Sequence, residues 1–378
     1  MKSLLFVVAL MLTTSGTVLA ADLPKDHNPR SDIWIDYSDL DYVLSKSVID
    51  MGPSTHQRAG RIKTNSMTRM YSGSRTASRF EARRVAFHEY RDNHRAVIRA
   101  IRDDLLALPS ELPLKDLSRT EQLVYWFNMH NVIVLAKIAE EYPITNLEPL
   151  FDRSNPRSFL VSETYMLGDQ PITLMDIQDH VLANWRDPLV IYGFYMGAVG
   201  TPDIRKEAFK SDRLNDQLRQ NARDFVNSVR GTQIWDGELR VSTYYSRMAD
   251  QFPDFEADVM RHLRQHARPS FARRLAEFES FDPRVDDWNI ADLYNGQLHE
   301  AGLSVHTSSE TAGGVTLAVK GLPSHVRHTL IGRELNFERS TLEGTVDIEE
   351  VAAGTSEAAE EKTPEEDKDD DPGELAIQ

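Results

Sequence analysis

A carboxylate, two amides and an imidazole occur together in one apolar stretch of the chain, residues 118–141. Glu121, Asn128 and Asn131 recur at spacings of seven and three residues, which places them along one side of a helix at about 100° per residue. His130 lies next to them in the sequence. Because burying an unpaired amide or carboxylate costs several kcal/mol, these groups either bond neighbouring loops and fix the fold, or line a cleft.

The chemistry that such a set could perform is nucleophilic attack by a hydroxyl. A nucleophile needs a base within reach, and the base needs a group that orients it. Thr201 is the candidate hydroxyl, His130 or His180 the candidate base, and Glu121 the orienting carboxylate. The loop before Thr201, GAVGT, lacks the strained nucleophile turn of many hydrolases. In the competing interpretation Thr201 is an ordinary loop residue, and His180 is a helix residue bonded to a backbone carbonyl.

Two further pairs of histidines have spacings that metal sites use. His262 and His266 lie four residues apart on a predicted helix, but the sequence HLRQH lacks the Glu of the HExxH arrangement. The charges around them predict a solvated helix face. His325 and His328, in SHVRH, predict a polar loop. The sequence therefore predicts no metal site, and it gives no sign of a cofactor.

Three other residues have predicted structural roles. Asp187 precedes Pro188, and an Asp in that place can bond the backbone of the following turn. Trp288 is expected to pack its ring on the core, and the amide of Asn289 to hold a loop. None of the three indicates catalysis.

The composition bounds the size and the compartment of the protein. Its 378 residues, of which 40% are hydrophobic, suffice for one large domain or two ordinary ones. Residues 1–20 resemble a secretory signal peptide, with a charged start, a short apolar run and small residues before Ala21. The chain has no cysteine, which excludes disulfides, thiol nucleophiles and thiolate ligands. We expect an exported protein, periplasmic or secreted, without an integral membrane segment in the mature chain.

The net charge of −16 is concentrated near the C-terminus, where residues 347–378 contain thirteen acidic residues and two lysines. Such a segment can bury little and repels itself, so an acidic, disordered tail is predicted. Nucleic-acid binding needs a clustered basic surface. The stretch 57–84 is basic, but acidic residues on both sides of it reduce the local positive charge. The predicted partner is therefore an unknown protein or small-molecule ligand, and not a nucleic acid.

Caps and turns predict the elements that hold these residues. Ser118 and Glu121 match a capping box, which begins a helix, and apolar residues all round that helix mark it as buried on most sides. Thr173 with Asp176 opens another helix in the same way. Further helices are predicted over 79–107, 203–228 and most of 243–280.

Turn residues predict the β structure. Gly168-Asp169 and Asp236-Gly237 are expected at the tips of two hairpins, and the apolar run 189–195 is expected to form a buried strand. The fold class is thus α+β: one large mixed domain, residues 21–297, with a buried central helix packed against a small sheet. Residues 298–346 are an unassigned extension with a pattern compatible with β structure.

Five segments, in this order, resemble the motif blocks of a known family: EQLVYWFNMHNVIVL, ITLMDIQDHVL, DPLVIYGFYMGAVGTP, TYYSRMADQF and FDPRVDDWNIADLY. The family is the one called domain of unknown function 547, and the chain is most similar to its exported bacterial branch. The resemblance spans roughly residues 33–296. It implies a single mixed α and β domain whose biochemical activity is not established.

Many members of that family carry a block similar to DPRIHFALxCAxxSCP, which invites comparison with papain-like and transglutaminase-like thiol hydrolases. Aligned on Asp187 and Pro188, this chain has Ile191 in place of the His, and Met196 and Thr201 in place of the two Cys. A thiol site of that kind therefore cannot operate in this chain.

Two hypotheses remain after the sequence analysis. The one we favour is an exported, non-catalytic binding or scaffold domain. The alternative is a papain- or transglutaminase-like hydrolase or transferase that uses a hydroxyl nucleophile with His130 or His180 and Glu121.

Overall fold

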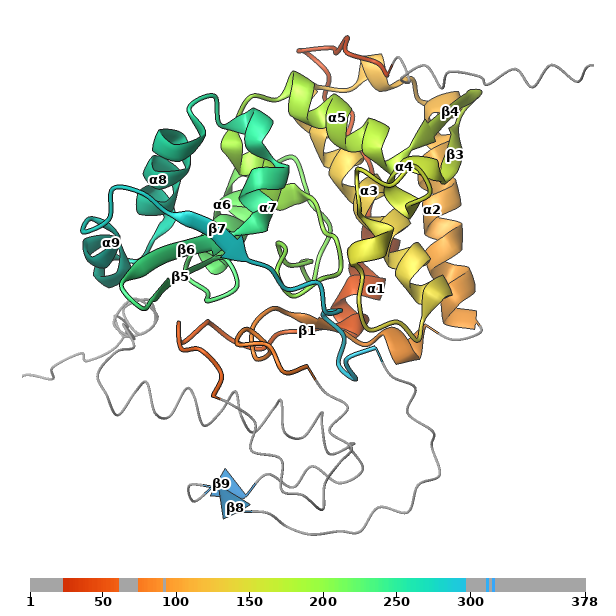
Figure 1. Ribbon diagram of the computed structural model, residues 1–378. Coiled ribbons are helices and arrows are strands. Elements are labelled where there is room, and N and C mark those ends of the chain that lie inside the picture. The colour runs from red at the N-terminus through yellow and green to blue at the C-terminus, as the bar shows by residue number, and fades with distance from the viewer. Residues whose placement is uncertain (1–22, 61–73, 91–92, 297–310, 313–314, 317–378) are drawn as a thin grey trace, which may run out of the picture.

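The computed structural model describes residues 23–60, 74–90 and 93–296, together with two short strands, β8 (Thr311–Ala312) and β9 (Val315–Thr316) (Figure 1). The α-helices are α1 (Ser38–Ser47), α2 (Asn93–Glu111), α3 (Arg119–Glu141), α4 (Phe159–Ser162), α5 (Leu174–Asn184), α6 (Leu214–Val226), α7 (Thr243–Arg247), α8 (Phe255–His266) and α9 (Pro269–Leu275). The other strands are β1 (Val48–Ile49), β2 (Arg84–Val85), β3 (Thr164–Leu167), β4 (Gln170–Thr173), β5 (Thr232–Trp235), β6 (Glu238–Ser242) and β7 (Asp282–Val285).

Five short 3-10 helices complete these elements: η1 (Phe87–Glu89), η2 (Leu114–Asp116), η3 (Glu148–Leu150), η4 (Pro188–Gly193) and η5 (Ala249–Gln251). The mixture of helices and small sheets confirms the α+β class. The predicted signal peptide 1–20 and acidic tail 347–378 lie outside the described residues. So does most of the extension 298–346, including His325 and His328.

Helix α3 is the buried central helix of the fold. It begins where the sequence predicts, because Ser118 Oγ accepts the Glu121 N–H at 3.2 Å. The other half of the predicted capping box is wrong: the Glu121 carboxylate accepts the N–H of Ile35 at 3.0 Å, and not that of Ser118. Every residue from Glu121 to Ala136 is buried, since α2 and α5 pack against the helix.

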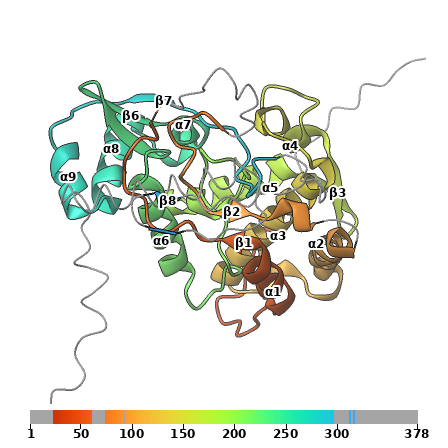
Figure 2. The ribbon, with the colours of Figure 1, turned by 90° about the horizontal axis from the view of Figure 1, so that it is seen from below.

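The elements form two groups that share one core (Figures 1 and 2). Helices α2, α4 and α5 and the β3–β4 hairpin surround α3, and helices α6 to α9 with the β5–β6–β7 sheet form the other group. One cluster of buried apolar side chains runs through both groups, from Trp126 in α3 to Phe225 in α6. Because η4 packs against α5 and α6, it forms the junction between the groups.

The two hairpins predicted from turn residues are confirmed. Strands β3 and β4 pair in antiparallel register across Gly168-Asp169, and β5 and β6 do so across Asp236-Gly237. Asp236 and Gly237 both have positive φ, at 56° and 76°, as a type I′ turn requires. Strand β7 then joins β6 in parallel. The capping box predicted at Thr173 and Asp176 is also present.

The buried strand predicted over 189–195 is wrong, because the chain forms the 3-10 helix η4 there. Asp187 Oδ1 accepts the Leu189 N–H at 2.9 Å and so caps the helix. Pro188 follows in the first helical position, where its fixed φ and missing N–H favour a helix start. A short apolar run alone does not distinguish a buried strand from a buried helix.

Two predicted helix ranges also need correction. Residues 79–90 are not helical throughout but contain β2 and η1, and α2 runs through Pro109 to Glu111 instead of ending before the proline. The helix predicted over 203–228 is limited to α6, from Leu214 to Val226. Residues 203–213 form an irregular segment that packs against α3.

The segment 286–295 connects distant parts of the fold through Asp292. This carboxylate is 1% exposed and accepts the N–H groups of Phe87, Tyr294 and Gly296 and the hydroxyl of Tyr142. Burial raises the pKa of Asp292, and the donors around it oppose that shift. A single side chain thus satisfies four polar groups.

We predict that Asp292→Ala lowers the free energy of unfolding by at least about 3 kcal/mol, because it leaves several buried donors without an acceptor. Urea denaturation followed by circular dichroism measures the change. As a control, Asp104→Ala removes an exposed carboxylate of α2 and should change the same quantity by no more than about 0.5 kcal/mol. Equal stability of the two variants would contradict the role assigned to Asp292.

Candidate functional site

The two asparagines of α3 each hold irregular backbone in place. Asn128 Nδ2 donates to the Phe209 carbonyl at 3.0 Å, and its Oδ1 accepts the Phe209 N–H at 2.9 Å. Asn131 Nδ2 likewise donates to the Gly193 carbonyl at 3.0 Å, and its Oδ1 accepts the Tyr195 N–H at 2.9 Å. Both side chains are buried. They bond neighbouring segments and fix the fold.

His130 is completely buried, and both of its ring nitrogens have partners. Nδ1 lies 3.0 Å from Asn131 Oδ1, and Nε2 lies 3.0 Å from Gln178 Nε2. Since the first neighbour is an acceptor and the second a donor, the hydrogen-bond network assigns the proton to Nδ1. Burial lowers the pKa of His130 to about 4. The ring is therefore neutral at pH 7 and sealed from substrate.

The carboxylate expected to orient this base lies on the opposite side of the helix. Glu121 and His130 are nine residues apart, which places them about half a turn out of phase in an α-helix. His130 faces Gln178 of α5, whereas Glu121 faces the segment 31–37. The two side chains do not form one site.

His180 has aromatic rings and an amide as its neighbours. Its ring packs between Trp126 and Trp185, and its Nδ1 lies 3.3 Å from the side-chain amide of Asn184. Burial lowers the pKa of His180 to about 4. Within the described part of the chain, no hydroxyl hydrogen-bonds to the ring of His180 or of His130.

The three positions that the sequence alignment on Asp187 and Pro188 singled out are packed into the core. They are 2% exposed or less: Ile191, Met196 and Thr201. Thr201 Oγ1 donates to the Ala198 carbonyl at 2.9 Å, which uses the one proton of the hydroxyl. At Gly193, an added Cβ would overlap the Phe127 ring of α3. The block and the helix are thus in direct contact.

The solvated helix face predicted for His262 and His266 is wrong. Both rings are buried, at 6% and 7% exposure, and their centroids are 4.5 Å apart. Tyr192 places its hydroxyl 2.8 Å from His262 Nε2 and 3.1 Å from the hydroxyl of Tyr245. Charged residues flank these histidines in the sequence, but both histidines lie on the buried face of α8 with its apolar residues.

The three residues with predicted structural roles lie outside the pocket described below. Asp187 caps η4. Trp288 is 7% exposed and stacks on Phe151. Asn289 Nδ2 donates to Asp287 Oδ1 at 2.7 Å, within the segment that carries Asp292.

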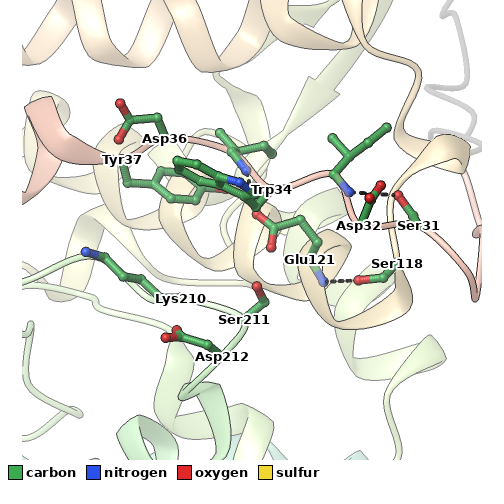
Figure 3. Close-up of a pocket in the computed structure, with 12 residues that line it drawn as sticks. Ser31, Asp32, Trp34, Asp36, Tyr37, Ser118, Glu121, Lys210, Ser211 and Asp212 are labelled. Carbon is green, nitrogen blue, oxygen red and sulfur yellow. Dashed lines mark hydrogen bonds between the residues drawn. The ribbon is translucent and has the colours of Figure 1, made fainter.

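An open pocket of about 470 Å³ lies at the start of α3 (Figure 3). Three parts of the chain line it: the segment 31–37, the first turn of α3 and the loop 210–212. Small-molecule sites in proteins have volumes of about 300–1,000 Å³, so a ligand of that size fits. Of the predicted site residues, Glu121 is the one that lines this pocket.

Glu121 connects the walls of this pocket. Its side chain is 2% exposed, and Oε1 accepts the N–H of Ile35, which fixes the segment that carries Trp34. The one hydrogen bond of the carboxylate among the described residues is this one, so the second oxygen, Oε2, has no partner there. Since Glu121 lies in the first turn of α3, the helix dipole favours its negative charge.

Tyr37 lies next to Glu121 and is 5% exposed (Figure 3). Burial and the negative charge of Glu121 raise the pKa of Tyr37 well above its usual value, and the nearby amide of Asn128 opposes the shift. Its hydroxyl has no partner at hydrogen-bonding geometry in the described structure. This hydroxyl is closed to solvent and lies beside the Asn128 amide, so it is not exposed to the pocket.

The rim of the pocket is aromatic and acidic. Trp34 is 70% exposed, the highest value among the large apolar residues of the described chain. Asp32 and Asp212 are exposed, and their carboxylates have no ion-pair partner among the described residues. Lys210 is the cation of the lining, and its Nζ pairs with Asp41 at 2.6 Å.

A second pocket, of about 280 Å³, is lined by charges that already compensate each other. Arg83 pairs with Asp224 at 2.9 Å, and Arg230 pairs with Asp203 at 2.8 Å. The first pair joins the residue before β2 to α6, and the second joins two loops. We therefore assign the candidate site to the first pocket.

Sequence reasoning names Glu121 but misses its neighbours in the pocket. The sequence of residues 32–45 predicts a short strand or turn that leads into a helix, which does not indicate a pocket wall. The loop 210–212 falls within the helix predicted over 203–228. Aromatic and acidic residues alternate in DIWIDYSD, and this is the signal that could have indicated an exposed binding segment. Nothing local in the sequence indicates that the two segments meet at Glu121.

The comparisons with known proteins agree with part of the resemblance. The model of a family described as protein of unknown function, DUF547, matches residues 114–226. The matched segment runs from η2 to the end of α6, so it includes α3 and η4. No curated protein and no solved structure matches the chain.

Within the described residues, the structure contains no helix with the length and hydropathy needed to cross a membrane.

The buried histidines predict how stability depends on pH. Burial lowers the pKa values of His56, His130 and His180 to about 4 and that of His262 to about 3. The unfolded chain binds protons at about pH 6.5, and the folded chain does not, so the free energy of unfolding should fall as the pH falls from 6.5 to about 4.

Each such histidine contributes up to about 1.4 kcal/mol per pH unit in this window. His130→Gln keeps a donor and an acceptor but removes one titrating group, so its stability should decline less steeply with acidification. Urea denaturation at several pH values between 4 and 7 measures the slopes. Parallel curves for the variant and the parent protein would contradict the prediction.

Proposed function

We propose that this chain is an exported, non-catalytic binding domain and that the pocket at the start of α3 is its binding site. The observation that carries the proposal is the side chain of Trp34, 70% exposed at the rim of a pocket of about 470 Å³. Covering such a ring removes apolar surface from water, which favours binding.

The separation of the candidate catalytic groups supports binding over catalysis. Catalysis by the hydroxyl route needs a nucleophile within hydrogen-bond reach of its base. Thr201 donates to a backbone carbonyl, His130 bonds two amides, and Glu121 lies on the other side of α3. Assembling them would require the core around α3 to rearrange.

The export part of the proposal rests on residues 1–20, whose charged start, apolar run and small residues before Ala21 are typical of a secretory signal. The absence of cysteine is compatible with an oxidising compartment, since no thiol needs protection there.

Expression of the full chain in a bacterium tests export. We expect the periplasmic fraction to contain a product that begins at Ala21, as intact-mass measurement can show. Val8→Asp interrupts the apolar run and should leave an unprocessed chain in the cytosol, whereas Ser3→Ala should behave like the parent. Cytosolic recovery of an uncleaved parent chain would refute export.

A ligand screen by thermal shift tests the binding site. We expect hits to raise the melting temperature of the parent protein, and Trp34→Ala to weaken them about tenfold or more, since it removes the exposed aromatic wall. Trp235→Ala is the matched control, because Trp235 is 49% exposed on the β5–β6 hairpin and away from the pocket.

Two outcomes would contradict the proposal. The first is a set of ligands that bind Trp34→Ala as tightly as the parent. The second is turnover of a peptide, amide or ester substrate that Thr201→Ala or His130→Gln abolishes while the fold is kept.

A further inference from the structure

We infer that the pocket at the start of α3 binds a cationic group, an ammonium or guanidinium, carried on an apolar stem. The inference rests on the proposed binding function and adds the chemical class of the ligand. It follows from the charges, the aromatic wall and the buried carboxylate of the pocket.

The charges of the pocket leave a negative balance. Asp32 and Asp212 lie on opposite sides of it (Figure 3), and among the described residues neither has an ion-pair partner. Glu121 adds a third carboxylate between them. The cation of the lining, Lys210, already pairs with Asp41 at 2.6 Å. A cationic ligand would supply the missing partner.

Asp36 also lines the pocket and adds its charge to this balance. Its carboxylate accepts the backbone N–H and the hydroxyl of Ser38 at 2.9 Å and 3.1 Å, at the start of α1. The carboxylate oxygens without a partner among the described residues are therefore those of Asp32 and Asp212 and Oε2 of Glu121.

An anionic ligand is disfavoured although a helix N-terminus lies in the pocket. The first turn of α3 would attract an anion through its dipole, but Ser118 Oγ already accepts a backbone N–H there. The carboxylate of Glu121 occupies the same turn. The negative group that this helix end favours is therefore part of the chain itself.

The aromatic groups fit the stem and the charge of such a ligand. Trp34 offers the face of an indole, to which cations bind within about 6 Å of the ring with a gain of about 0.5–2 kcal/mol. Ile33, 39% exposed, adds apolar surface to the same wall.

One acceptor remains at the base of the pocket. Glu121 Oε1 accepts the Ile35 N–H, and Oε2 has no hydrogen-bond partner among the described residues. An ammonium has three donors and a guanidinium has five, so either group can donate to this oxygen. A neutral apolar ligand has no donor for it.

Isothermal titration of the full chain at low salt tests the inference with a matched pair of probes. One is a blocked Ala-Arg-Ala peptide, and the other has citrulline, which has the shape of arginine without its charge. We expect the arginine peptide to bind at least about tenfold more tightly. Blocked Ala-Lys-Ala and free spermidine then distinguish a basic peptide from a free polyamine as the source of the cation.

Variants locate the effect in the pocket. The double variant Asp32→Asn, Asp212→Asn keeps the shape and should weaken the arginine peptide about fivefold or more, with less dependence on salt. Trp34→Ala should weaken it about tenfold. The controls Asp104→Asn and Trp235→Ala remove an exposed carboxylate and an exposed indole elsewhere and should bind like the parent.

The outcomes separate this inference from the proposed function. Equal binding of the arginine and citrulline peptides, or Trp34-dependent binding of only neutral or anionic ligands, would overturn the cationic class and leave the binding function intact. Failure of every cationic probe to bind also overturns it. Binding that no substitution in the pocket changes would overturn both.

Discussion

The side-chain amides of α3 hold the irregular half of the fold in place. Between η4 and α6, residues 197–200 bond the backbone of residues 287–291. The buried N–H and carbonyl groups on either side of that pairing need other partners. Asn128 supplies both a donor and an acceptor to Phe209, as a neighbouring strand would. Asn131 does the same for Gly193 and Tyr195. Removing either amide would leave polar backbone buried in an apolar core.

The position of the candidate site follows from the same helix. Going from Asn131 to Asn128 to Glu121, the polar groups of α3 approach its N-terminus, where the open pocket lies. Glu121 leaves its expected capping role and bonds Ile35, which is next to Trp34. Glu121 therefore has two roles: its backbone N–H is capped by Ser118 at the start of α3, and its carboxylate holds the segment that carries the exposed aromatic ring.

Features that a few adjacent residues determine could be predicted from the sequence. The start of α3 at Ser118, the capping box at Thr173 and the turn at Asp236-Gly237 each follow from local hydrogen bonds or local φ values. The class of the fold follows from the mixture of these elements. The polar residues of α3 could also be singled out, because an amide on an apolar helix needs a partner.

Features that depend on distant partners could not be predicted. The run 189–195 is apolar in either a strand or a 3-10 helix, and packing at the junction of the two groups decides between them. His262 and His266 lie among charged residues in the sequence, yet both are buried. The Tyr192 hydroxyl is a hydrogen-bond partner of His262. The pocket itself joins residues 31–37 with the loop 210–212, and no local pattern indicates that these segments meet.

The segment from Ile191 to Thr201 is buried, so it lies apart from the open pocket that we propose as the binding site. An ionisable side chain at position 191 would be fully buried, and burial disfavours its charged form. The residues present are apolar or, in Thr201, satisfied by a backbone carbonyl. This region therefore contributes to packing against α3. Of the predicted site residues, Glu121 is the one that reaches an open pocket, and it does so among unpaired carboxylates and beside an exposed indole. These are groups suited to holding a ligand by charge and surface contact.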